Sequence, residues 1–381
     1  MYLHVVSFDI PSPPTYGGVI DVYYKLKALH ALGVKIILHT FWYSRPEAPD
    51  LLEICEDVVY YPRKPILRSL PVKIPHIVKS RGIDTLLDNL TDYPYPILFE
   101  GLHTTYYLGH PALRGRLRMV RMHNIEWEYY YQLAQRESDY LRKQYFLAES
   151  RLLREYEQVL AHADRIYTIS PKDTSYYQET FPQKTAYLPA FHAHTSVTSL
   201  TGQGDYCLYH GKLSVPENHE AALYLIREVF APLGLPLIIA GAEPLPDLIT
   251  AINAHENILL RPDPSVEEMD DLLRQAHIHV LPTFQATGIK LKLINSLYQG
   301  RFVLVNAPMV FRTGLEFSCS VARDTEEFRK MTRELFFTPF TEIDIAQRKA
   351  SLRDTFDTRH NAGAIVSLMQ AHANPHKLPG A

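Results

Sequence analysis

The sequence has 381 residues, of which 46% are hydrophobic and 21% are charged, and its formal net charge at pH 7 is -3. This length exceeds what one hydrophobic core usually serves, so we expect two domains of roughly 150–200 residues each. No apolar run approaches the ~18 residues that a membrane-spanning helix needs, and the near-neutral charge argues against nucleic acid as a partner.

The first residues and the cysteines bear on location. Residues 1–10, MYLHVVSFDI, lack a basic segment and a small-residue cleavage site, so they predict a first strand rather than a signal peptide. Cys55, Cys207 and Cys319 lie far apart and lack the spacing of zinc or redox motifs. We therefore expect a cytoplasmic protein with buried free thiols.

The first half of the chain alternates strands and helices. A strand at 3–8 leads through a loop rich in proline and glycine into a helical pattern at 19–32, and a second strand follows at 34–41. This order implies parallel strands. Further short apolar runs continue the alternation at 58–61, 97–99, 118–122 and 165–169, and the longest predicted helix covers 128–161. The pattern is typical of a doubly wound, Rossmann-like domain.

The alternation of strands and helices begins again after a linker. Residues 189–205 are rich in His, Thr, Ser and Gly and have no hydrophobic period, as an interdomain connection would. Strands are predicted after it at 206–209, 236–240, 258–260, 278–281 and 302–305, and helices at 217–229, 266–275 and 288–299. The last stretch, 341–372, is mostly helical and could pack back across the N-terminal half.

The segment 282–306, PTFQATGIKLKLINSLYQGRFVLVN, places a polar loop at the carboxyl end of a strand and opens directly into a helix. Ligands bind at such places in open α/β sheets because unpaired helix N–H groups and the helix dipole attract phosphate. Lys290 and Lys292 would add positive charge there. The alternative is two solvated lysines on an ordinary helix.

Four strings occur in an order that indicates a family. They are the Gly17-Gly18 loop, HisAsnIleGlu at 123–126, GKLSVPEN at 211–218 and the segment 282–306. With them the chain resembles family 4-type GT-B glycosyltransferases, in the branch that carries a Gly-Ile-Lys-Leu-Lys string, over most of its length.

The resemblance implies an α/β GT-B fold, with two facing Rossmann-like domains, parallel sheets and a C-terminal helix that returns to the N-terminal domain. The implied domains are 1–190 on the acceptor side, 203–340 for the donor nucleotide sugar, and a helical segment at 341–381 that packs back on the first domain.

The resemblance also assigns catalytic residues. His123 should face the reacting sugar, where an imidazole can donate to hydroxyls or to developing charge. Glu126 could orient His123 or bind a hydroxyl, or it could simply favour the dipole of the following helix. Gly17 and Gly18 would let backbone approach the ligand cleft without a Cβ in the way, although a mere turn is the alternative.

Donor binding is assigned in the same way. Charge-assisted bonds from Lys212 and Lys290 would offset the charge that builds on the departing nucleotide. The full expected donor set is Gly17, Gly18, Lys212, Asn218, Thr287, Gly288, Lys290 and Asn295. The chain contains no Asp-x-Asp string, so we expect neither a metal nor another cofactor.

Thr287 and Asn295 depart from the family, since many members have glutamates at these two positions. Asn295 can still bond the ribose hydroxyls, but a neutral acceptor is worth roughly half a charged one. Glu217 likewise stands where a second basic residue is common. Because of these departures, the sequence does not identify the donor sugar and does not establish that the protein is catalytically active.

The expected activity is transfer of a hexosyl unit from a nucleoside-diphosphate sugar to a hydroxyl of a glycan or lipid-linked sugar, with retention and without metal. One alternative is a sugar-nucleotide epimerase of the same fold, and another is a degenerate protein that binds nucleotide sugar or glycan without turnover. Basic residues at 62–81 and 114–121 could give weak peripheral contact with the inner membrane face, or simply form a solvated charged surface.

Overall fold

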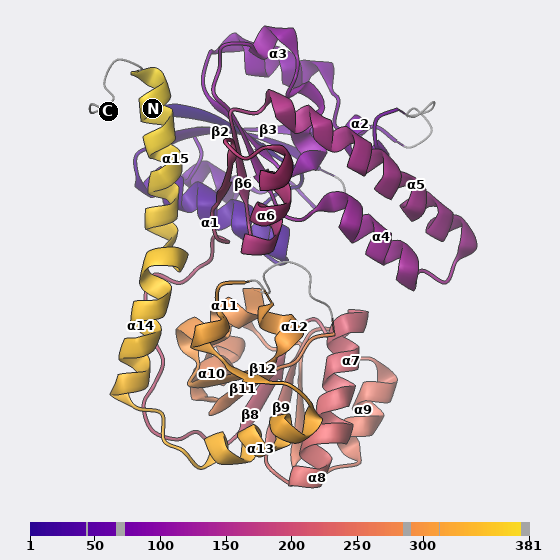
Figure 1. The fold of residues 1–381 in the computed structure, drawn as a ribbon, viewed down its shortest axis with the longest axis vertical. Helices are drawn as coiled ribbons and strands as arrows, with labels where there is room; N and C mark the ends of the chain where they lie inside the picture. Colours follow the sequence, from indigo (N-terminus) through magenta and orange to yellow (C-terminus); the bar gives the residue numbers. More distant parts are fainter. Residues whose placement is uncertain (43–44, 66–72, 285–290, 312, 375–381) are drawn as a thin grey trace. The chain divides into compact units, whose positions relative to one another are not determined.

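Two parallel β-sheets organise the chain (Figure 1). The computed structural model describes residues 1–42, 45–65, 73–284, 291–311 and 313–374. The chain divides into two compact units, the first made of Met1–Ala193 with Thr358–Ala381 and the second of His194–Asp357.

Seven parallel strands form the sheet of the first unit, in the order β3-β2-β1-β4-β5-β6-β7. They are β1 (Tyr2–Ser7), β2 (Lys35–Trp42), β3 (Asp57–Pro62), β4 (Ile97–Glu100), β5 (Arg118–Met122), β6 (Arg165–Thr168) and β7 (Thr185–Tyr187). Strand β4 is buried along its whole length because helices cover both faces of a parallel sheet. The strand order reverses direction between β1 and β4, where Val5 lies opposite Leu98.

The first unit has helices on both sides of this sheet. They are α1 (Gly17–Ala31), α2 (His76–Lys79), α3 (Asp84–Asp92), α4 (Glu126–Arg136), α5 (Tyr140–Tyr156), α6 (Pro171–Thr180) and α15 (Thr358–Ala373), with 3₁₀ turns at Pro49–Glu53, Leu102–Tyr107, Pro111–Leu113 and Glu157–His162. The predicted helix 128–161 is two helices, since the chain leaves helical geometry after Arg136 and the Asp139 side chain accepts from the Arg142 N–H to start α5.

The C-terminal helix α15 packs against α1 in the first unit. Ala362, Ile365 and Met369 join the core residues Val22 and Leu26 of α1. The expected return of the last helix to the N-terminal domain is confirmed.

The second unit repeats the architecture with six parallel strands in the order β10-β9-β8-β11-β12-β13. The strands are β8 (Cys207–His210), β9 (Leu237–Gly241), β10 (Ile258–Pro262), β11 (Ile278–Leu281), β12 (Phe302–Asn306) and β13 (Ser320–Ala322). The helices are α7 (Pro216–Tyr224), α8 (Ala231–Leu233), α9 (Pro246–Asn253), α10 (Val266–Gln275), α11 (Leu291–Gln299), α12 (Ala307–Val310), α13 (Thr325–Phe336) and α14 (Glu342–Phe356), with a π-helical turn at Leu225–Phe230 and a 3₁₀ turn at Glu316–Ser318. Two parallel-sheet, Rossmann-like domains are therefore present, as the sequence predicted.

The structure divides the segment 341–381, which was expected to pack as a whole on the first domain. Helix α14 belongs to the second unit, where Arg348 donates to the carbonyl oxygen of Gly300 and stacks on the ring of Phe340. Only the part from Thr358 onward belongs to the first unit. The other unit boundary lies between Ala193 and His194, within the predicted linker.

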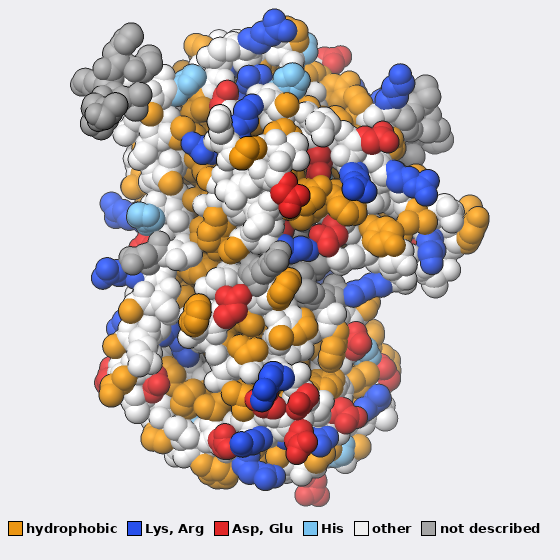
Figure 2. Space-filling view, in the orientation of Figure 1, with side chains coloured by type: hydrophobic (Ala, Val, Ile, Leu, Met, Phe, Trp, Pro, Cys, Tyr) orange, Lys and Arg blue, Asp and Glu red, His pale blue; other side chains and the backbone are white. Residues whose placement is uncertain are grey.

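Basic residues of the stretches 62–81 and 114–121 make internal contacts as well as lying on the surface. Arg81 is 4% exposed and donates to the carbonyl oxygens of Phe8 and Ile77, and Arg121 is fully buried. On the face drawn in Figure 2, Lys and Arg side chains are interspersed with Asp and Glu. Within the described part of the chain, no helix combines the length and the apolar character needed to cross a membrane.

Candidate functional site

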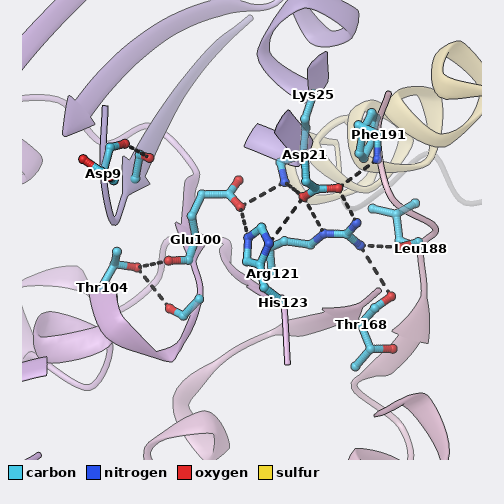
Figure 3. A network of polar contacts seen from close by, with 12 residues as sticks. Asp9, Asp21, Lys25, Glu100, Thr104, Arg121, His123, Thr168, Leu188 and Phe191 are labelled. Atoms are coloured by element: carbon cyan, nitrogen blue, oxygen red, sulfur yellow. Dashed lines mark hydrogen bonds and ion pairs between the residues drawn. The ribbon is translucent and has the colours of Figure 1, made fainter. Parts of the chain in front are cut away.

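A buried network of charged side chains lies at the carboxyl ends of the central strands of the first unit (Figure 3). Lys25 Nζ lies 2.8 Å from Asp21 Oδ2, one turn earlier on α1, and 2.9 Å from Glu100 Oε2 at the end of β4. Arg121 of β5 donates to both oxygens of Asp21, through Nε at 3.1 Å and Nη2 at 2.8 Å. His123, two residues further, places Nε2 3.0 Å from Glu100 Oε2.

The network is balanced in charge, with two carboxylates against two cations. Burial raises the pKa of Asp21, but Arg121, Lys25 and His123 outweigh it and hold that pKa well below its usual range. Oxygens of Asp21 and Glu100 and a nitrogen of His123 lie within 4.8 Å of one another, as metal ligands would. The Lys25 ammonium already lies between the two carboxylates, so it supplies the positive charge that a cation would bring.

His123 is fixed on three sides. Its Nε2 faces Glu100, its Nδ1 lies 3.9 Å from Asp21 Oδ2, and the ring of Phe8 meets it edge-on with 5.3 Å between centroids. A Cβ at Gly18 would come within 2.7 Å of the Phe8 ring. In this structure Gly18 therefore makes room for Phe8 beside His123, while Gly17 is the exposed first residue of α1.

Glu126 is also buried, at the start of α4, but its contacts are different. Its Oε2 lies 3.7 Å from His103 Nε2, and its Oε1 has no hydrogen-bond partner among the described residues. Burial, chiefly, raises the pKa of Glu126 to about 8, and burial also raises the pKa of Glu157 to about 7 and of Asp173 to about 6. Glu126 is therefore largely protonated at pH 7 and can donate a hydrogen bond.

The side chain that bonds to His123 is Glu100, which the sequence analysis did not single out. Its position at the end of a short buried strand beside the His123 strand is a signal that could have indicated it. Asp21 and Lys25 carried no such signal, since charged residues on a helix usually face solvent.

In the second unit, polar residues gather where the sheet order reverses between β8 and β11, the place where open α/β sheets bind ligands. The ends of β8 and β9 lie so close that a Cβ on Gly241 would be 1.7 Å from the carbonyl oxygen of Gly211. Lys212 is the residue directly after Gly211 in the sequence. Its Nζ is paired at 2.8 Å with Glu243, and both side chains are more than half exposed.

Asn218 of α7 connects two lysines at this edge. Its Nδ2 donates to the carbonyl oxygen of Lys212 at 3.0 Å, and its Oδ1 accepts from Lys292 Nζ at 3.0 Å. The Lys292 ammonium also lies over the ring of Tyr209, 4.9 Å from its centroid. The structure thus brings the backbone of Lys212 and the side chains of Asn218 and Lys292 together.

Asn295 lies elsewhere on α11, where its Oδ1 lies 3.0 Å from His194 Nε2. The His194 ring stacks on Tyr298 with 5.2 Å between centroids. Thr287, Gly288 and Lys290 lie outside the described residues. The carboxylate of Glu217, which stands where a second basic residue is common in the family that the sequence resembles, accepts a hydrogen bond from the Thr283 hydroxyl.

Comparison with known proteins gives relatives in both sequence and structure. No protein family profile matches the sequence. A Klebsiella pneumoniae protein described as an uncharacterized 44.6 kDa protein in the cps region is 24% identical over 323 residues, which cover 79% of this chain and 81% of that protein.

Three solved glycosyltransferase-type structures align with nearly the whole chain. Sucrose-phosphate synthase from Thermosynechococcus elongatus aligns with a TM-score of 0.67 at 15% identity, covering 98% of this chain and 100% of that one. TarM aligns at 0.63 with 7% identity, covering 97% and 98%, and WaaG, a glycosyltransferase involved in lipopolysaccharide biosynthesis, at 0.58 with 12% identity, covering 99% and 100%. The chain therefore has the GT-B fold of glycosyltransferases.

Proposed function

We propose that this protein is a glycosyltransferase that moves a hexosyl unit from a nucleoside-diphosphate sugar to a hydroxyl acceptor. The observation that carries the proposal is the gathering of Lys212, Asn218 and Lys292 at the reversal point of the second sheet. Two ammonium groups at the carboxyl edge of a parallel sheet suit a diphosphate. The GT-B fold over the full length supports the same conclusion.

In this proposal the second unit binds the donor. Lys212 exchanges Glu243 for the diphosphate, Lys292 and Lys290 add positive charge, and Asn295 bonds the ribose. Their combined charge stabilises the departing nucleotide without a metal ion. Retention of configuration and membership of the family 4 branch follow from the sequence resemblance and are part of the proposal.

In the first unit His123 and Glu126 act on the transferring sugar or the acceptor. Glu126, protonated near neutral pH, can donate to a sugar hydroxyl, and its Oε1 has no hydrogen-bond partner among the described residues. Glycan or lipid-linked acceptors are supported by the similarity to WaaG, whose reaction belongs to lipopolysaccharide biosynthesis. Cytoplasmic location, with weak peripheral contact at the membrane, completes the proposal.

The test is acceptor-dependent release of nucleoside diphosphate, measured with a panel of nucleotide sugars that stabilise the protein against heat. We expect release with at least one donor only when a glycan or lipid-linked acceptor is present. Binding of a nucleotide sugar without release, over a broad acceptor panel, would instead support a binding protein, the candidate that Thr287 and Asn295 favour. Consumption of donor without acceptor or release would indicate an epimerase.

A further inference from the structure

The carboxylate of Glu100 makes its two side-chain hydrogen bonds through a single oxygen. Lys25 Nζ and His123 Nε2 approach Oε2 at 2.9 and 3.0 Å, whereas Oε1 is buried with no hydrogen-bond partner among the described residues. A carboxylate held only for packing would be better satisfied with one donor on each oxygen, because a buried polar atom without a partner costs about 1–3 kcal/mol. The arrangement directs the charge of Glu100 at the imidazole.

An ionised carboxylate accepts hydrogen bonds and cannot donate them. Lys25 Nζ can only donate and already bonds Oε2, so this oxygen acts as an acceptor, and the His123 nitrogen that faces it must be the one that carries hydrogen. We propose that Glu100 is a positioning residue, which fixes His123 in the Nε2–H form and holds its ring in one orientation for the reaction. The inference rests on the proposed function for its catalytic consequence.

The surroundings of the ring support a single orientation. Turning the imidazole over would exchange Nε2 and Nδ1 for carbon atoms and leave Glu100 without its second donor. Phe8 meets one side of the ring edge-on, and Gly18 leaves room for Phe8 at that place. Nδ1 is the remaining nitrogen, and it has no hydrogen-bond partner among the described residues.

Lys25 and Glu100 form an ion pair that solvent does not reach. Both side chains are 0% exposed, as is Asp21, the other partner of Lys25. A buried charge pair keeps its geometry because breaking it would leave an uncompensated charge in the interior. The side chains of α1 and β4 therefore form a rigid support for a histidine that follows β5.

The proposal is tested by ¹⁵N NMR of the histidine rings in the full chain, with the His123 signals assigned by their loss in His123→Gln. In the wild type we expect a protonated Nε2 and an unprotonated Nδ1 for neutral His123. In Glu100→Gln the ring should lose this fixed pattern, because the amide can donate or accept. Turnover should fall on the order of 10²-fold with KM changed less than about threefold, since a misplaced group costs mainly in the transition state.

Two control variants separate positioning from simple destabilisation. Glu149→Gln changes a carboxylate that is likewise buried in the first unit, but one that accepts from the backbone of His76 and Ile77, so it should leave the His123 spectrum and turnover unchanged. Asp21→Asn removes the other carboxylate beside Lys25 and should destabilise the fold while preserving the Nε2–H pattern.

The outcomes distinguish the two proposals. A wild-type spectrum without a fixed Nε2–H, or a Glu100→Gln spectrum identical to wild type, overturns the positioning role whatever the activity. A fixed Nε2–H that Glu100→Gln disturbs, in a protein that never releases diphosphate, supports the positioning role and removes only the proposed transferase activity. Normal turnover in Glu100→Gln overturns the catalytic consequence.

Discussion

The polar groups of the two units are held in opposite ways. In the first unit Asp21 and Arg121 are 0% exposed and bond each other in the interior, whereas in the second unit Lys212 and Glu243 are 54% and 59% exposed. Breaking a buried pair leaves a charge without water, while an exposed pair exchanges partners at little cost. The first arrangement suits groups that must stay in place, and the second suits groups that must release one anion and bind another.

The largest expected effect concerns the buried ion pair between Arg121 and Asp21 in the first unit. Arg121→Leu should lower the free energy of unfolding by about 3–5 kcal/mol, because Asp21 would remain buried without its guanidinium partner. Urea unfolding followed by circular dichroism measures it. Arg323→Leu, which removes an exposed partner of Glu327, is the matched control and should change nothing measurable. Equal effects in the two variants would abolish the contrast between the units.

His123→Ala should lower turnover by about 10²-fold, the scale of losing one positioned electrostatic or acid-base group. Its effect on unfolding should be smaller than that of Arg121→Leu, because Lys25 still pairs with Glu100 after the imidazole is removed. Acceptor-dependent diphosphate release and thermal melts of both variants give the comparison. Full activity of His123→Ala would remove this residue from the mechanism and leave the fold assignment intact.

Glu126 should make stability depend on pH. Its carboxyl ionises near pH 4.5 when unfolded but only near pH 8 when folded, so the folded state binds the extra proton between these values and loses stability as pH rises through them. The free energy of unfolding of Glu126→Gln should therefore rise relative to that of the wild type by about 3–4 kcal/mol between pH 5 and pH 8, and the two proteins should differ little below pH 5. Urea titrations at several pH values test this, and a pH-independent difference would show that the carboxyl is ionised in the fold.

The smallest effect is expected at the exposed edge of the second unit. Lys212→Ala should weaken binding of a nucleoside diphosphate about 3–10-fold, because a solvent-exposed ammonium contributes modestly to a phosphate contact. Calorimetry with a chelator present measures the affinity and tests the expected metal independence. Lys330→Ala, which removes an exposed partner of Glu334 in the same unit, is the control. Unchanged affinity in Lys212→Ala would exclude the contact.

Local patterns were enough for most of the strands and for several helices, whereas β7, β13, α3, α6, α9 and α13 were not individually predicted. The apolar runs at 97–99 and 278–281 lie within β4 and β11, because a strand buried on both faces is apolar along its length. The predicted helix at 128–161 hid a break, since residues 137–139 carry no glycine or proline and the interruption depends on the cap that Asp139 provides. The placement of 341–381 differed because α14 is held by Gly300 and Phe340, contacts that no local pattern encodes.

The sequence by itself determined two Rossmann-like windings, a linker between them and the position of His123 at the end of a strand. It also indicated Lys212 and Asn218 as candidate donor-binding residues, because they lie in the GKLSVPEN string that follows the strand at 206–209. Tertiary structure alone decided what surrounds His123. Asp21 and Arg121 are 100 residues apart, and Glu100 is 75 residues from Lys25, so only the parallel order of β1, β4 and β5 brings them together. The burial of a charged side chain cannot be predicted from a helix pattern when the partner of that charge lies on another element.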